Sequence, residues 1–200
     1  MKKNLLIAVS VAGLFLLIAL SCSREDGISA ASPAFKLMET ERLSIPAAIE
    51  LPANLPNGNS RVATFYAEGL QKYKAQVKAG SDPVMYEWLF VAPEADLYDA
   101  SNAKVGTHGA GPFWQLSATD SIFGQAFTPA KTATPDANSI PWLQLVPKNG
   151  KMPTGIFSNV AYIQRIATTG GKAPEAAPKS LSDKADVFYT AVYRFSKKNP

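Results

Sequence analysis

The sequence is poor in the residue types that most often hold metals and disulfides. Its 200 residues include one cysteine, Cys22, and one histidine, His108. A disulfide framework needs paired cysteines, so the chain cannot form one within itself. A structural zinc site needs about four Cys or His ligands. We therefore expect no metal site, and no sequence motif points to another cofactor.

Charged residues are also scarce, at 18%, whereas hydrophobic residues make up 46% of the chain. That balance excludes a wholly disordered protein. The net charge of +4 includes Lys2 and Lys3, and it falls to about +2 if a signal segment removes them. Binding of nucleic acid needs a clustered basic face. We therefore expect no nucleic-acid partner.

The sequence has no apolar run of the length that readily crosses a membrane. The longest, Leu5–Leu20, is shorter than the roughly 20 residues required to span the hydrocarbon core. Lys2 and Lys3 precede this run and small residues follow it, which is typical of a secretory signal. We interpret residues 1–21 as a signal peptide, with an uncleaved membrane anchor as the alternative.

The lone cysteine follows this segment directly. Ala19-Leu20-Ser21-Cys22 resembles the lipobox of bacterial lipoproteins, in which the cysteine becomes the new N-terminus and is acylated. Each buried methylene of an acyl chain contributes about 0.8 kcal/mol, so two or three chains anchor a protein stably. We expect Cys22 to carry a lipid anchor and the protein to lie in the bacterial cell envelope, on a periplasmic or surface face of the outer membrane. A free thiol is the alternative.

The rest of the chain divides into two parts. Residues 22–57 contain repeated prolines, which favour extended chain, and we interpret them as a lipid-anchored flexible tether and lead-in. Residues 58–197 show the alternation typical of strands, most clearly from Val187 to Phe195. No convincing amphipathic helix of 12 or more residues follows position 60.

Turn signals separate these strands. Asp99–Lys104 and Asn149-Gly150 predict turns, and the proline-containing segments Thr128–Ser139 and Gly170–Ser182 predict loops. Many short strands joined by turns favour a sandwich or a barrel. We therefore predict an all-β fold, a single antiparallel β-sandwich or barrel-like domain.

The densest motif is Gly106–Trp114, which contains three glycines, His108 and an aromatic pair. The functional interpretation is that His108 contacts a ligand, or acts as acid or base, beside the aromatic platform of Trp114. The structural interpretation is a glycine-rich strand bend whose histidine bonds a neighbouring carbonyl. The spacing is not that of a dinucleotide fold, and the chain has no phosphate-binding loop.

Carboxylates and tryptophans give two weaker signals. Glu94 and Asp96 are expected to share a strand face, where they could hold calcium or simply form a solvated edge. Trp88, Trp114 and Trp142 could stack on a sugar ring, although tryptophans of a small β protein usually lie in its core. No nucleophile elbow marks a serine hydrolase.

Several ordered motifs resemble an uncharacterised secreted family, domain of unknown function 3455. The resemblance covers about residues 45–196. It is carried by Trp88–Asp99 (WLFVAPEADLYD), Val105–Trp114 (VGTHGAGPFW), Ile140–Leu143 (IPWL), Tyr162–Pro174 (YIQRIATTGGKAP) and Tyr189–Phe195 (YTAVYRF). The family implies export and an all-β pattern but no established activity.

The resemblance raises five residues as candidate ligand contacts, because each falls on a family motif: His108, Trp114, Trp142, Gln164 and Arg165. Relatives often have a cysteine at the position of Ala75 and another after Pro174, and this chain has neither. The resemblance therefore implies that the domain is stabilised by packing alone.

Together these observations predict a non-enzymatic module that binds a small molecule, a glycan or an envelope protein around His108, Trp114 and Arg165. The guanidinium of Arg165 would serve as the cationic anchor, because its planar fork matches a carboxylate or phosphate. The alternative is a secreted hydrolase with His108 as general base, which needs a nucleophile or carboxylate within about 3 Å of the ring.

Overall fold

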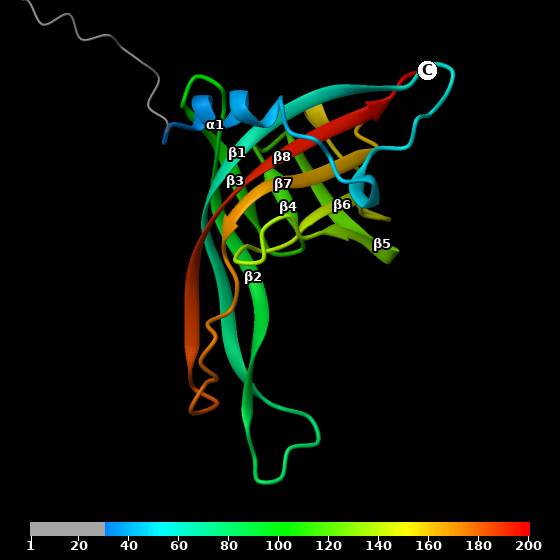
Figure 1. Cartoon of the computed structure of the whole chain (residues 1–200). Coiled ribbons are helices and arrows are strands. Elements are labelled where there is room, and N and C mark those ends of the chain that lie inside the picture. The colour runs from blue at the N-terminus through cyan, green and yellow to red at the C-terminus, as the bar shows by residue number, and fades with distance from the viewer. Residues whose placement is uncertain (1–30) are drawn as a thin grey trace, which may run out of the picture.

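A computed structural model describes residues 31–200, so the predicted signal peptide and Cys22 lie outside the described residues. Within that range the chain forms one sheet of eight antiparallel strands, which follow one another in chain order and close into a barrel (Figure 1). The all-β prediction is confirmed, and of its two architectures the barrel is the one observed.

The elements have the following bounds. The strands are β1 (Asn59–Val77), β2 (Tyr86–Tyr98), β3 (Lys104–Gly109), β4 (Phe113–Gln115), β5 (Ser121–Ala133), β6 (Trp142–Pro147), β7 (Tyr162–Gly170) and β8 (Lys184–Lys198). One α-helix, α1 (Pro33–Thr40), and two short 3-10 turns, η1 (Ala47–Ile49) and η2 (Gly155–Phe157), complete the described part. No helix within residues 31–200 has the length and apolarity needed to cross a membrane.

The barrel closes where its first and last strands meet. β1 and β8 pair from Asn59 opposite Lys198 to Lys74 opposite Lys184. The alternating series predicted in β8 points inward, and Tyr189, Tyr193 and Phe195 are almost fully buried. Together with side chains of the other strands they fill the lumen, as expected for a barrel of eight strands.

A second apolar cluster lies on the outer face of the barrel. It contains Leu37 of α1 and Ile49 of η1 together with barrel residues. Ser32 caps the N-terminus of α1, because its hydroxyl accepts a hydrogen bond from the Phe35 amide at 3.3 Å. Pro33 occupies the first position of the helix, where its missing N–H costs no hydrogen bond. The later part of the predicted lead-in is therefore packed against the barrel.

One predicted turn and one predicted loop can be compared directly with the structure. The Asp99–Lys104 turn is confirmed, because the Asp99 carboxylate accepts bonds from the Ser101 and Ala103 amides. The predicted loop at Thr128–Ser139 is wrong in its first half, since β5 continues to Ala133. Its pairing with β6 shifts register between Ala126 and Lys131, and this irregularity accommodates Pro129, which has no N–H to donate.

Candidate functional site

His108 and Trp114 lie inside the barrel. They are paired residues on β3 and β4, and only 3% of His108 and none of Trp114 is exposed. Their rings stack with centroids 4.7 Å apart and planes 16° apart. The two residues therefore meet as the sequence suggested, but they meet in the core. A concavity of about 610 Å³ borders His108 from the outer side, and Trp114 does not line it.

Both ring nitrogens of His108 have partners. Nδ1 lies 2.7 Å from the Phe113 carbonyl oxygen, and Nε2 lies 2.9 Å from the Tyr193 hydroxyl. A carbonyl only accepts hydrogen bonds, so Nδ1 carries the proton and Nε2 accepts from Tyr193. Burial lowers the pKa of His108 to about 3, which keeps the ring neutral. The bond to a neighbouring carbonyl is the one that the structural interpretation of this motif describes.

Arg165 of β7 lies on the same inner face of the sheet as His108 and Trp114, and it pairs with Leu143 of the neighbouring strand β6. Its Nη2 donates to the Pro141 carbonyl at 2.8 Å, and its Nε donates to the same oxygen at 3.2 Å. Burial raises the pKa of Tyr189 and of Tyr193, and the positive charge of Arg165 opposes that rise in both. Arg165 therefore already has a structural partner and faces the tyrosines of the barrel interior.

Trp142 and Gln164 lie on the opposite, outer face of the sheet. Gln164 Nε2 donates to the Ile49 carbonyl at 2.7 Å, which fastens η1 to β7. Trp142 belongs to the outer apolar cluster with Leu37 and Val192. The five candidate residues are thus divided between the two faces and do not form one site.

The carboxylates that the sequence singled out form ion pairs with lysines. Glu94 pairs with Lys72, and Asp96 Oδ1 lies 2.8 Å from Lys104 Nζ. No group of three or more His, Cys, Asp or Glu residues within positions 31–200 is arranged to hold a metal ion. Glu94 and Asp96 therefore lie on a solvent-exposed face of β2 and form ion pairs.

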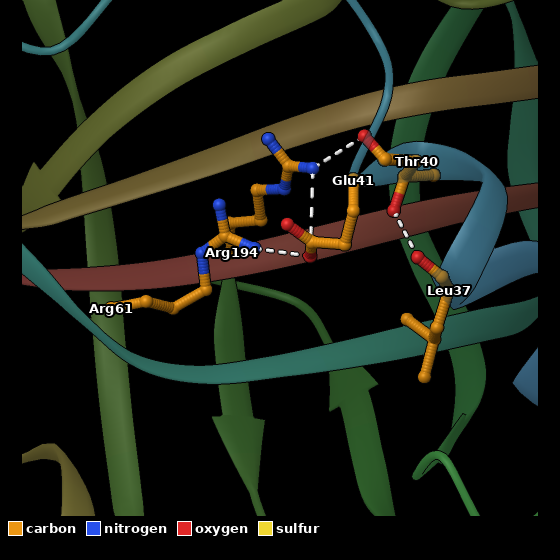
Figure 2. A network of polar contacts seen from close by, with 5 residues as sticks. All are labelled: Leu37, Thr40, Glu41, Arg61 and Arg194. Carbon is orange, nitrogen blue, oxygen red and sulfur yellow. Dashed lines mark hydrogen bonds and ion pairs between the residues drawn. The ribbon is translucent and has the colours of Figure 1, made fainter.

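A polar clamp that the sequence did not reveal holds α1 on the barrel (Figure 2). Arg194 of β8 is almost completely buried, and its Nη2 donates to the Thr40 carbonyl at 2.5 Å. The Glu41 carboxylate lies 3.7 Å from the same nitrogen and also pairs with Arg61 of β1. One carboxylate after the helix therefore joins two arginines from neighbouring strands. Arg194 also places a cation at the helix C-terminus, where it is favoured.

Next to this clamp, α1 and the outer face of the barrel enclose a groove of about 610 Å³. Its apolar floor includes Tyr66, Trp142 and Val192, which are buried by the surrounding chain. Lys36 and Arg42 lie at the α1 side, and Thr169 and Thr190 contribute hydroxyl groups from β7 and β8. Of the five residues predicted from sequence, only Trp142 lines this groove. The other lining residues come from distant segments, and no local motif could have grouped them.

A closed eight-stranded barrel with a packed interior and one helix clamped outside defines the structural class of this protein. A family model described as a protein of unknown function (DUF3455) matches residues 56–197. The chain belongs to this family, which confirms the resemblance noted in its motifs. No curated protein and no solved structure matches the chain. The family match includes the barrel strands and begins after α1.

Proposed function

We propose that this protein is a non-enzymatic binding module that holds a small amphipathic molecule in the groove between α1 and the barrel. The observation that carries the proposal is the combination of a concave space of about 610 Å³ with an aromatic floor. Binding sites for small molecules are typically apolar clefts of about 300–1,000 Å³ with a few polar groups at defined positions.

The floor and the rim suit different parts of one ligand. Above the largely buried rings of Tyr66 and Trp142, the lining residues Met38 and Leu43 are 52% and 38% exposed and offer apolar surface for a flat ring or an acyl chain. Arg42 has no ion pair among the residues that the structure describes, so its guanidinium is available to a carboxylate, sulfonate or phosphate. The ligand class that fits is therefore an apolar body with one anionic or acceptor group.

The hydrolase alternative receives less support from the same geometry. A histidine that acts as general base must present a ring nitrogen that can take a proton from substrate or water. In the described part of the chain, both nitrogens of His108 bond to protein atoms and the ring is closed off from solvent. Binding is therefore the function that we propose.

We also propose that the module is attached to the cell envelope by acyl chains on Cys22. The lipobox-like sequence and the preceding apolar run support this proposal. Replacing Cys22 with alanine should leave an uncleaved precursor without acyl chains, detectable by mass spectrometry. Normal processing and acylation of that variant would contradict the proposal.

The groove can be tested with anilinonaphthalene sulfonate, a fluorescent probe that joins an apolar ring system to an anion. We expect the folded protein to bind it with enhanced probe fluorescence and with quenching of tryptophan emission. Thr169→Trp places a ring in the groove and should weaken binding by about tenfold or more, which is at least about 1.4 kcal/mol.

The matched control is Thr132→Trp, because Thr132 is an exposed strand threonine on β5 and lines neither the groove nor the concavity beside His108. This variant should bind the probe like the unaltered protein, with an unchanged circular dichroism spectrum. Equal probe binding by both variants would show that the groove is not the binding site.

A further inference from the structure

Part of the sheet projects beyond the barrel as a three-stranded ribbon, which Figure 1 shows as long strands running away from α1. β1 lies in the middle and pairs with both β2 and β8 as far as Lys74. β3 pairs with β2 only from Ala95 to Tyr98. The segment Tyr86–Glu94 of β2 therefore has a strand neighbour on one side only, among the residues described.

This free edge of β2 is apolar and poorly protected. Leu89, Phe90 and Val91 are 38%, 47% and 51% exposed, and Met85 at the start of the edge is 50% exposed. The residues Trp88–Ala92 carry no charge. An exposed strand edge presents unpaired N–H and C=O groups, and proteins usually guard such edges with lysine or other charges.

The other edge of the same ribbon is guarded in that way. The start of β8 contains Lys184 and Asp186, both exposed, between its less polar positions. The β2 edge also has two charged residues, Glu87 and Glu94, but five uncharged residues lie between Glu87 and Pro93, whereas the charges on β8 occupy alternate positions at its start. The two edges of one ribbon thus differ in how charge is distributed along them. The contrast indicates that β2, and not β8, is the edge suited to pair with another strand.

We propose that β2 pairs with β2 of a second copy of this chain, antiparallel about a twofold axis near Trp88. The two ribbons would then form one continuous six-stranded sheet between two barrels. An isologous contact of this kind is closed, because each edge is used once, so the assembly stops at a dimer.

The side chains are self-complementary in this register. Tyr86 of one copy comes opposite Phe90 of the other, an aromatic cross-strand pair, and Met85 comes opposite Val91. Glu87 comes opposite Leu89, so no two carboxylates face each other along the strand. An axis between Phe90 and Val91 would instead place Glu87 opposite Glu94, which is unfavourable. Charge therefore disfavours that register, whereas the one centred near Trp88 leaves Glu87 of each copy opposite an uncharged residue and pairs the aromatic rings.

The ends of the pairing are also defined. β1 and β2 shift register at Val91, which leaves that residue in a bulge, and Pro93 has no N–H to donate to a new strand. The turn before Tyr86 ends the edge on the other side. The pairing segment is therefore about Met85–Val91.

The test is the oligomeric state of the full chain in a mild nonionic detergent, measured by sedimentation over a range of protein concentrations. The unaltered protein should be a dimer that dissociates on dilution. Leu89→Lys and Val91→Lys should lose the dimer, because each adds a charge to the edge at an already exposed position.

Phe188→Lys is the matched control, because Phe188 is 56% exposed on β8 of the same ribbon. It should keep the dimer, and circular dichroism should show that all three variants are folded. A monomeric unaltered protein, an assembly larger than a dimer, a dimer that survives Leu89→Lys, or one lost equally in Phe188→Lys would each overturn the proposal.

Discussion

The inner and the outer face of the barrel differ in their buried polar contacts. Inside, neutral polar groups are enclosed with aromatic rings, and His108 bonds both to Tyr193 and to a backbone carbonyl. Outside, under α1, a buried cation, Arg194, reaches a carbonyl and a carboxylate of the lead-in. The contacts of His108 involve only barrel strands, whereas the outer ones attach a separate segment. The interior is therefore suited to stability, and the outer face is where we propose that the ligand binds.

The largest effect should come from removing the ring at the centre of the interior. Trp114 is fully enclosed and contacts His108, Tyr193 and Phe195. Trp114→Ala should lower the free energy of unfolding by about 3–5 kcal/mol, because it leaves a large cavity. Denaturant unfolding of the whole domain measures this loss. A loss below about 1 kcal/mol would mean that the interior is not the stabilising region.

The interior also predicts a dependence on pH. The pKa of His108 is about 3 when folded and near 6.5 when unfolded. Below pH 6.5 the unfolded chain binds a proton that the folded chain does not, so stability is full above that pH and falls as pH decreases toward 3. One proton corresponds to a slope of at most about 1.4 kcal/mol per pH unit.

Denaturant unfolding between pH 7 and about pH 5.5 measures this slope, because the carboxylates of the unfolded chain remain almost fully ionised over that range. His108→Gln is the control, since it removes the titrating ring, and its stability should vary less over the same range. An identical slope in both proteins would assign the pH dependence to other groups.

The difference between the two faces also explains what the sequence could predict. Alternation was sufficient to predict β8, because the side chains of a strand with one buried face alternate between that face and the other. The same reasoning could not decide the role of His108. The sequence of this glycine-rich motif is the same whether its histidine contacts a ligand or a carbonyl of its own hairpin.

The groove and the clamp could not be predicted for a different reason. Arg194 meets Thr40 across 154 positions of the chain, and Trp142 shares an apolar cluster with Leu37, about 105 positions earlier. Such contacts depend on where α1 packs, which its eight residues do not specify. The family motifs led to Trp142 as a candidate, but they could not separate it from His108 and Trp114, which lie on the other face.

The smallest expected effect tests whether the outer segment is independent of the barrel. Glu41→Gln removes the carboxylate shared by Arg61 and Arg194, and it leaves the bond from Arg194 to the Thr40 carbonyl. Because Glu41 is half exposed, we expect a cost of about 1 kcal/mol or less, confined to the clamp. Hydrogen exchange should speed up in α1, with the amides of β1 and β8 unchanged. Glu39→Gln, which alters only an exposed pair with Lys36 inside the helix, should have a smaller effect. If exchange instead rose equally in α1 and in the strands, the clamp would be part of the cooperative core, and the two faces would unfold as one unit.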